Sequence, residues 1–267
     1  MTTPAPRTVL LTGAAGGVGA LLRDRLPAYG YALRLFDIVP VPGDPDAIAA
    51  DLLDNTALRA AVRGVDAVVH LAGISQEAPF ADLLTSNIEG TYRLYEAARA
   101  EGVQRIVLAS SNHAVGFTPR PAAPGVAVAT TTPLRPDTLY GLSKCFGENL
   151  ASLYADKYGI ETVSLRIGSC CPRPRTVRML ATWLSPADCA RLVHAALTAE
   201  EIHHAVVYGI SANTRAWWDL SAGAALGYTP RDDAEIFAEQ LIAELGEPLP
   251  DDPERTHIGG SFLTAEP

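Results

Sequence analysis

The feature that most constrains the fold of this chain is a glycine-rich turn between an apolar run and a helical pattern. Residues 8–12 (TVLLT) have the length and composition of a buried strand. The turn that follows contains Gly13, Gly16, Gly17, Val18 and Gly19. Such a turn lets an anion approach backbone N–H groups at a helix N-terminus. Its GxxGxxG spacing also suits any sharp strand-to-helix connection, so the dinucleotide-binding unit that it predicts needs support from its context.

The context is a second apolar run that ends in an acid. Residues 32–36 predict a strand, and Asp37 and Ile38 follow it directly. Asp37 stands about where an acidic residue meets the adenosine ribose hydroxyls in dinucleotide-binding folds. Because its carboxylate would repel a 2'-phosphate, the sequence predicts NAD rather than NADP.

Strands and helices continue to alternate along the chain. Further strands are predicted at 48–50, 67–71, 104–109 and 161–168, and helices at 56–62 and 83–100, the first capped by Asp54 or Asn55. This alternation predicts an α/β fold, a Rossmann-type doubly wound parallel sheet that binds ligands at the carboxyl ends of its strands. Asp51 follows the third strand. It either accepts from an adenine amino group, with Leu52 donating its backbone N–H, or caps the next helix.

A second informative motif is Tyr140, followed four residues later by Lys144 in a predicted helix. The two side chains would lie one turn apart on the same face. A free tyrosine has a pKa of roughly 10, so it is a poor base near neutrality unless a nearby cation stabilises its phenolate. Lys144 is a candidate for that cation, although a Tyr–Lys pair at this spacing is commonly an ordinary surface pair.

Taken together, these motifs resemble the extended short-chain dehydrogenase/reductase superfamily. The matching segments are TGAAGGVG (12–19), Asp37, DL (51–52), HLAG (70–73), Asn87, Ser111 and the Tyr140–Lys144 pair. HLAGIS (70–75), SSNHAVG (110–116), LYGLSKCFGENLA (139–151) and RIGSC (166–170) resemble the uronate dehydrogenase family more narrowly. That resemblance implies oxidation of D-galacturonate or D-glucuronate at C1 to the aldarolactone, with NAD⁺ as the hydride acceptor. It leaves the preferred uronate and the lactone ring size open.

The resemblance also implies roles for individual residues. Tyr140 would be the base, Lys144 would hold the phenolate and the nicotinamide ribose, and Ser111 would orient the reacting hydroxyl. His113 is an alternative base, but it leaves Lys144 unexplained. The expected cofactor contacts are Gly13, Gly16, Gly17, Val18, Gly19, Asp37, Ile38, Asp51, Leu52, Leu71, Ala72, Gly73, Asn87, Tyr140, Lys144 and Ile167.

A uronate carries a carboxylate, which needs a local cation in an acidic protein. Arg173, Arg175 and Arg178 follow the sixth predicted strand in a Pro-rich loop. The first two are interpreted as solvated charges, and Arg178 matches the position that binds the substrate carboxylate in the resembled family. The expected substrate contacts are Ser75, Ser111, Asn112, His113, Ser169 and Arg178. His70, inside an apolar strand, is interpreted as a core histidine.

Composition excludes several other classes of function. The chain has 21 basic and 30 acidic residues, a net charge of -9, which argues against nucleic-acid and anionic-membrane partners. Residues 1–7 lack the apolar core of a signal peptide, so a cytoplasmic protein is expected. The cysteines, at 145, 170, 171 and 189, have no zinc-like spacing; we expect reduced thiols and no metal. A homo-oligomer is expected by analogy with the superfamily.

The whole chain, 1–267, is predicted to form a single domain, with 170–185 and 210–267 supplying most of a substrate lobe and tail. A helix at 186–198, a strand at 205–208 and a helix at 233–245 are predicted there, and Trp217 and Trp218 are assigned to a core or subunit contact. Two alternatives remain open. A nucleotide-sugar epimerase or dehydratase would retain its cofactor, and a non-catalytic dinucleotide sensor would not need the Tyr140–Lys144 pair.

Overall fold

The computed structural model describes residues 8–121 and 126–267, built around a parallel sheet of seven strands in the order β3-β2-β1-β4-β5-β6-β9. The N-terminal segment 1–7, on which the signal-peptide prediction rests, lies outside these residues. The strands of the sheet are β1 (Thr8–Thr12), β2 (Ala32–Asp37), β3 (Ile48–Ala49), β4 (Ala67–His70), β5 (Arg105–Ser111), β6 (Glu161–Ile167) and β9 (His204–Gly209). A separate parallel pair consists of β7 (Ser169–Cys170) and β8 (Trp183–Leu184).

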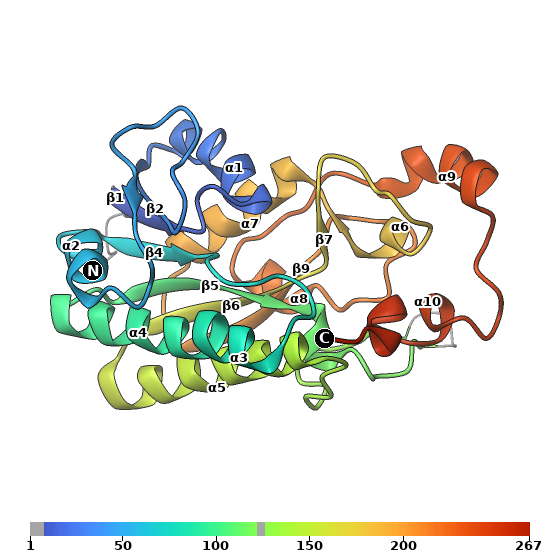
Figure 1. Cartoon of the computed structure of the whole chain (residues 1–267). Coiled ribbons are helices and arrows are strands. Elements are labelled where there is room, and N and C mark those ends of the chain that lie inside the picture. The colour runs from blue at the N-terminus through green and yellow to red at the C-terminus, as the bar shows by residue number, and fades with distance from the viewer. Residues whose placement is uncertain (1–7, 122–125) are drawn as a thin grey trace.

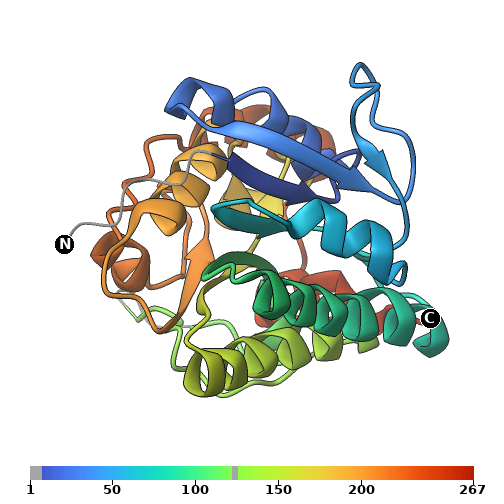
Figure 2. The same ribbon diagram turned by 90° about the vertical axis from the view of Figure 1, so that its left-hand side faces the viewer.

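Helices cover both faces of the sheet (Figures 1 and 2). The α-helices of the described residues are α1 (Gly17–Arg23), α2 (Asn55–Val62), α3 (Phe80–Leu83), α4 (Gly90–Glu101), α5 (Leu139–Tyr158), α6 (Met179–Thr182), α7 (Pro186–Thr198), α8 (Ser221–Ala225), α9 (Ala238–Leu245) and α10 (Pro253–Thr256). Short 3₁₀ turns lie at Leu26–Tyr29, Asn112–Val115, Ala234–Phe237 and Gly260–Thr264. The predicted helix at 186–198 is confirmed as α7.

Side chains along β1 point alternately to the two faces of the sheet, and a hydrophobic core lies on each face. Val9 and Leu11 pack in the cluster that contains residues of α1 and α7, whereas Leu10 packs in the cluster with α2, α4 and α5. All three are fully buried. Successive residues of a strand point to opposite faces, so an apolar strand buried on both sides requires helices on both sides.

The ligand-binding edge follows from the strand order. β1 pairs with β2 on one side and with β4 on the other, so the chain reverses its direction of winding at β1. A crevice forms at such a switch point, beyond the carboxyl ends of the strands. The glycine turn after β1 and the loops after β4 and β5 therefore meet at one edge.

The sequence predicts one long helix at 83–100, and the structure corrects this prediction. The structure has α3, then a π-helical segment at Leu84–Glu89, then α4. Asn87 lies buried in the π segment and bonds to the loop after β4, an interaction that apolar periodicity does not reveal. The helix predicted at 233–245 likewise divides into the 3₁₀ turn Ala234–Phe237 and α9.

Beyond the carboxyl ends of the strands, α6, α9 and α10 form the right-hand part of the molecule in Figure 1. Trp217 and Trp218 are buried in a cluster with Val115 and Tyr208, which confirms a core position for both tryptophans. Among the described residues, no helix combines the length and the apolar composition needed to cross a membrane.

Candidate active site

The glycine turn is shaped by close backbone contacts. Gly13 has a φ of 70°, and a Cβ at this position would lie 2.7 Å from the Ala72 backbone nitrogen. A Cβ on Gly19 would lie 2.2 Å from the Gly13 carbonyl oxygen. These two positions require glycine because β1, the turn and the loop after β4 touch there. Gly17 has nothing within 4 Å of an added Cβ, so the turn is open on that side.

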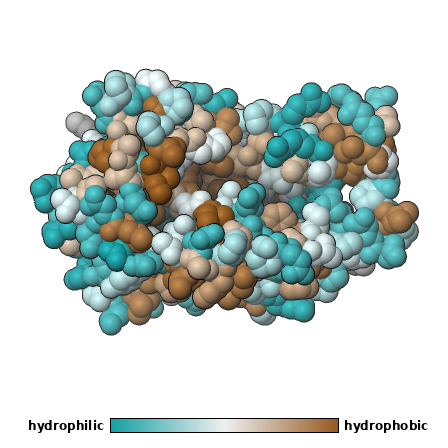
Figure 3. All heavy atoms as spheres, in the orientation of Figure 1, coloured by the Kyte–Doolittle hydropathy of each residue, from teal (hydrophilic) through white to brown (hydrophobic). Residues whose placement is uncertain are grey.

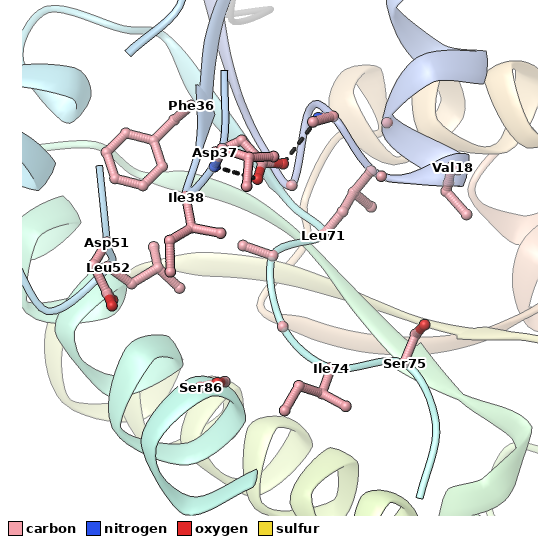
Figure 4. Close-up of a pocket in the computed structure, with 18 of the residues that line it drawn as sticks. Val18, Phe36, Asp37, Ile38, Asp51, Leu52, Leu71, Ile74, Ser75 and Ser86 are labelled. Atoms are coloured by element: carbon pink, nitrogen blue, oxygen red, sulfur yellow. Dashed lines mark hydrogen bonds between the residues drawn. The ribbon is translucent and has the colours of Figure 1, made fainter. Parts of the chain in front are cut away.

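The Asp37 carboxylate is fixed at the end of β2, next to the glycine turn. One oxygen accepts from the Ala15 backbone N–H at 2.8 Å, and the other accepts from the Val39 N–H at 3.2 Å (Figure 4). The side chain is held by the backbone on both sides. An acid in this position meets the requirement for recognising adenosine ribose hydroxyls.

Beside this carboxylate lies a cavity of about 450 Å³, which we call the dinucleotide cavity. The predicted cofactor contacts that line it are Gly13, Gly16, Gly17, Val18, Gly19, Asp37, Ile38, Asp51, Leu52, Leu71, Ala72 and Gly73. Figure 4 shows the side chains of Ile38, Leu52 and Leu71 around the space, and Figure 3 shows the surface hollowed here, with apolar residues along one rim. Such a volume is ordinary for a ligand site.

The two interpretations of Asp51 are resolved in part. Its carboxylate accepts from the Leu53 backbone N–H at 2.9 Å, as in a local turn, and Asp51 also lines the dinucleotide cavity. The cap of α2 is Asp54, which accepts from the N–H groups of Thr56 and Ala57. Asp51 therefore remains available at the cavity wall.

Asn87 is used within the protein instead of lining the dinucleotide cavity. Its amide oxygen accepts from the Ile74 N–H at 2.8 Å, and its amide nitrogen donates to the Ile74 carbonyl and the Ser143 hydroxyl, both at 2.9 Å. A Cβ on Gly73 would lie 2.7 Å from the Asn87 oxygen. Asn87 thus fastens the loop after β4 to α5, and the direct cofactor contact expected from the sequence stays a prediction.

Tyr140, Lys144 and Ser111 lie together in a second cavity of about 380 Å³, which we call the substrate cavity. The Lys144 ammonium donates to the Ala109 carbonyl at 3.0 Å and lies 5.5 Å from the centre of the Tyr140 ring. The substrate cavity shares Leu71, Gly73 and Ser75 with the dinucleotide cavity, so the two are neighbours. Ile167, predicted as a cofactor contact, also lines the substrate cavity.

Burial sets the proton affinities of the Tyr–Lys pair. Burial raises the pKa of Tyr140 to about 12, an effect that the Ser111 hydroxyl partly offsets and Asp137 reinforces. Burial also lowers the pKa of Lys144 to about 8. Tyr140 therefore needs added positive charge beside it before it can act as a base near neutrality, and Lys144 remains largely cationic there.

The start of α5 positions Tyr140 through two caps. The Thr138 hydroxyl accepts from the Gly141 N–H at 2.9 Å. The Glu77 carboxylate, from the loop after β4, accepts from the N–H groups of Leu139 at 3.1 Å and Tyr140 at 2.8 Å. Carboxylates are favoured at helix N-termini by unpaired N–H groups and the helix dipole. The loop that contains Ser75 is thereby tied to the helix that contains Tyr140.

His113 has a defined orientation in the substrate cavity. Its Nδ1 lies 2.7 Å from an oxygen of the buried Asp137, which can only accept, so Nδ1 carries a hydrogen. Burial lowers the pKa of His113, and Asp137 partly offsets this, so the neutral ring leaves Nε2 as an acceptor. The ring stacks on Phe262, with ring centres 3.9 Å apart.

Arg178 is held at the wall of the substrate cavity by partners from two distant segments. The Asn112 amide donates to the Ile167 carbonyl at 3.1 Å and accepts from Arg178 Nη2 at 3.0 Å. The same Nη2 donates to the Ile258 carbonyl. A Cβ on Gly260 would lie 2.6 Å from Arg178 Cδ, so glycine allows the tail to pass over this side chain.

The other loop residues take different positions. Ser169, predicted as a substrate contact, lines the substrate cavity and shares a hydrogen bond of 2.9 Å with the Thr182 hydroxyl. Arg173 is exposed and donates to Gln240, in agreement with a solvated charge. Arg175 is also exposed but lines the substrate cavity, which sequence reasoning missed.

Several other residues at the site were not predicted. Asp137, Glu77 and the tail residues Glu254, Ser261 and Phe262 contact or line the site. The tail follows an acidic, Pro-rich stretch that resembles a surface segment, and nothing in its local pattern indicates a cavity wall. Asp137 lies three residues before Tyr140, and that proximity was the one available signal.

His70 lies between two threonine hydroxyls inside the fold. His70 is buried, with Nδ1 2.7 Å from the Thr12 hydroxyl oxygen and Nε2 3.3 Å from that of Thr91, which confirms a satisfied core histidine. The described residues contain no group of three or more histidine, cysteine, aspartate or glutamate side chains that could hold a metal ion.

Comparisons with known proteins agree with this geometry. Residues 9–174 match the NAD dependent epimerase/dehydratase family. Over 271 residues the chain is 46% identical to uronate dehydrogenase of Pseudomonas putida, covering 100% of this chain and 99% of the relative. Glucuronic acid dehydrogenase from Chromohalobacter salexigens has a similar structure, with 47% identity, a TM-score of 0.92 and 98% of both chains covered. A uronate dehydrogenase variant from Agrobacterium tumefaciens complexed with NAD has 45% identity and a TM-score of 0.91, covering 97% of this chain and 98% of that chain. The chain therefore belongs to the uronate dehydrogenases, within the NAD dependent epimerase/dehydratase family.

Proposed function

We propose that this protein oxidises an aldohexuronate, D-galacturonate or D-glucuronate, at C1 to the aldarolactone, with NAD⁺ as the hydride acceptor. The observation that carries the proposal is one cavity that holds both a Tyr–Lys–Ser set and a partly buried arginine, Arg178. The first can remove a hydroxyl proton and the second can bind a carboxylate. A uronate offers both groups on one small molecule.

The dinucleotide cavity fits NAD. Its glycine turn presents an open backbone at Gly17, and Asp37 stands ready to accept from ribose hydroxyls. Gly13, Gly16, Val18 and Gly19 would hold the pyrophosphate, Ile38, Asp51 and Leu52 would enclose the adenine, and Leu71, Ala72, Gly73 and Ile167 would border the route to the nicotinamide. When bound, NAD⁺ supplies the hydride acceptor. The Asp37 carboxylate disfavours the 2'-phosphate of NADP.

Tyr140 would take the proton of the C1 hydroxyl. Its raised pKa makes this unfavourable unless positive charge lies close by, and the Lys144 ammonium supplies such charge within the same cavity. Ser111 would donate to the reacting oxygen and keep it facing Tyr140. Lys144 would also bind the nicotinamide ribose.

Arg178 would bind the substrate carboxylate. A planar guanidinium presents paired donors that match a carboxylate, and Asn112 and the Ile258 carbonyl fix its plane. We place Ser169 at the same end of the substrate. Ser75, Asn112 and the acceptor Nε2 of His113 would contact sugar hydroxyls.

We further propose that residues 1–267 act as one domain, with 170–185 and 210–267 as the substrate lobe and tail, in a cytoplasmic homo-oligomer. The described cysteines are free thiols, which suits a reducing compartment. Tyr92 of α4 and Leu142 and Leu153 of α5 are 47–48% exposed, and such apolar side chains suit a subunit contact. Light scattering coupled to size-exclusion chromatography measures the assembly directly.

The experiment that tests the reaction follows NADH absorbance with purified protein, NAD⁺ and one of galacturonate, glucuronate, galactose or glucose. We expect NADH with the two acids only, and higher catalytic efficiency with NAD⁺ than with NADP⁺. An epimerase or dehydratase would instead retain tightly bound NAD and release no NADH. Equal rates with acids and neutral sugars would contradict the role of Arg178.

A further inference from the structure

A third cavity, of about 700 Å³, shares Arg178 with the substrate cavity, and we call it the arginine cavity. Its described wall comes entirely from segments outside the parallel sheet. The wall contains Arg120, Pro121, Val177, Arg178, Ala181, Arg215, Trp217, Glu247, Pro248, Glu254, Arg255 and Thr256. Four arginines against two glutamates make this wall positive in a chain whose net charge is -9.

The arginines of this wall differ in the partners that lie near their guanidinium groups. Arg215 pairs with Glu235 at 2.8 Å and lies 3.5 Å from Glu247. Arg255 is exposed and donates to the Pro248 carbonyl at 3.2 Å. A second glutamate, Glu254, raises the pKa of Arg178 through its charge, although burial dominates and lowers it. Among the described residues, no carboxylate forms an ion pair with Arg120 or Arg255, although the charge of Glu247 also acts on Arg120.

Arg120 is the most distinctive group in this wall. Its guanidinium lies over the Trp217 ring, 3.9 Å from the ring centre, and no described side chain or carbonyl accepts a hydrogen bond from it. Burial, and then the like charge of Arg255, lower the pKa of Arg120, and the charge of Glu247 partly offsets both effects. A half-buried guanidinium beside a second cation is stabilised by an anion.

Trp217 forms the aromatic part of this wall. The residue is 6% exposed and lines the cavity, and the Arg120 guanidinium lies against its ring. The arginine cavity therefore combines a guanidinium that has no hydrogen-bond acceptor among the described residues with an aromatic surface.

We propose that the arginine cavity is a second binding site, for a small organic dicarboxylate, with Arg120 and Arg255 each facing one carboxylate. The cavity volume suits a molecule of sugar-acid size. A guanidinium pairs with a carboxylate through two parallel donors, and two separate arginines suit two carboxylates better than one compact anion.

The position of the site predicts an effect on the substrate cavity. Arg178 and Glu254 belong to the walls of both cavities. A dianion beside Arg178 would weaken its attraction for a second carboxylate, so occupancy should raise the KM for a uronate. This coupling rests on the proposed function, whereas binding itself does not.

Calorimetric titration of the whole protein with galactarate, in the presence of excess NADH, tests binding without turnover. We expect a galactarate-binding event whose affinity falls at least tenfold in Arg120→Gln and in Arg255→Gln. Arg255 is exposed, so its variant should fold even if Arg120→Gln loses stability. Arg63→Gln removes an exposed arginine at the C-cap of α2 and should leave the titration unchanged. Titrations identical in wild type and both cavity variants would overturn the proposal.

Two further arms define the ligand class and the coupling. Inorganic phosphate at matched ionic strength should displace galactarate poorly, and displacement as effective as that by galactarate would refute the dicarboxylate assignment. In steady-state assays of the wild type, part of the inhibition by galactarate should come from binding at the arginine cavity. That part should be absent in Arg255→Gln. Inhibition that is purely competitive and equal in both would refute the coupling. If the protein had no uronate activity, the steady-state assay would give no rate to inhibit. The titration would still measure binding at the arginine cavity.

Discussion

At the scale of single residues, the central fact is that burial opposes the chemistry proposed for Tyr140. A pKa of about 12 leaves very little phenolate at neutral pH, so the base depends on cations beside it. Lys144 is placed to provide this charge because its ammonium is anchored on the Ala109 carbonyl. The two residues therefore act as one unit, because Tyr140 needs the charge of Lys144 to serve as a base.

Replacing Tyr140 by Phe removes the proposed base and little volume. We expect kcat to fall by at least about a hundredfold, the lower end of the range typical of general bases, with NAD⁺ affinity retained. Steady-state rates and calorimetric NAD⁺ binding measure the two effects separately. A variant that keeps a tenth or more of the wild-type kcat would show that Tyr140 is not the base.

Replacing Arg178 by Ala removes the proposed carboxylate partner. A charged hydrogen bond of this kind contributes about 1.5 to 3 kcal/mol, so kcat/KM for uronates should fall roughly 10- to 150-fold. Any residual activity on a neutral sugar should change far less. Arg173→Ala is the matched control, because Arg173 lies in the same loop but contacts Gln240. Equal losses on acids and neutral sugars would contradict the carboxylate role.

At the scale of elements, the catalytic helix α5 is positioned by a loop distant in sequence. Glu77 caps its first N–H groups, and Asn87 joins the same loop to α5 through the Ser143 hydroxyl. The π segment that contains Asn87 interrupts what would otherwise be one regular helix. These contacts connect the walls of the dinucleotide and substrate cavities.

Glu77→Gln tests whether this cap positions Tyr140. Loss of the carboxylate should lower the free energy of unfolding by about 1 kcal/mol, as measured in urea, and reduce kcat several-fold. Asp54→Ala is the control, because Asp54 caps α2 away from the substrate cavity and should reduce stability without changing kcat. A Glu77 variant with lower stability and unchanged kcat would limit the cap to a structural role.

At the scale of the whole molecule, buried histidines make stability depend on pH. Burial, with a smaller effect of the Lys144 charge, lowers the pKa of His70 to about 3, whereas an unfolded histidine titrates near 6.5. The stabilising contribution of neutral His70 is complete above pH 6.5 and is lost progressively as the pH falls towards 3, because the unfolded chain then binds more protons.

Because the free energy of unfolding should fall as the pH is lowered, substitutions of a buried and an exposed histidine should have measurably different effects. Between pH 6.5 and 5.5 the His70 contribution to the free energy of unfolding should fall by about 1 kcal/mol. His70→Asn should remove that part of the slope in urea titrations at the two pH values. His203→Asn changes an exposed histidine and should follow the wild type. An unchanged slope in His70→Asn would mean that His70 is protonated in the folded protein.

The sequence by itself determined the features that depend on near neighbours. The spacing of Gly13 and Gly19, the acid at Asp37 and the apolar strands predicted a doubly wound sheet and its ligand edge, because steric fit and alternating burial are local properties. The Tyr140–Lys144 spacing similarly predicted a shared helix face. These expectations agree with the observed strand order and with the residues that line the two ligand cavities.

The tertiary structure alone decided the contacts between distant segments. It directed the Asn87 amide to the loop after β4, placed Glu77 on α5 and brought Phe262 onto His113. It also placed Arg178 between two cavities. Such contacts depend on where loops and the tail cross the sheet edge. They satisfy buried polar groups that a local sequence pattern cannot pair, because the partner lies many residues away.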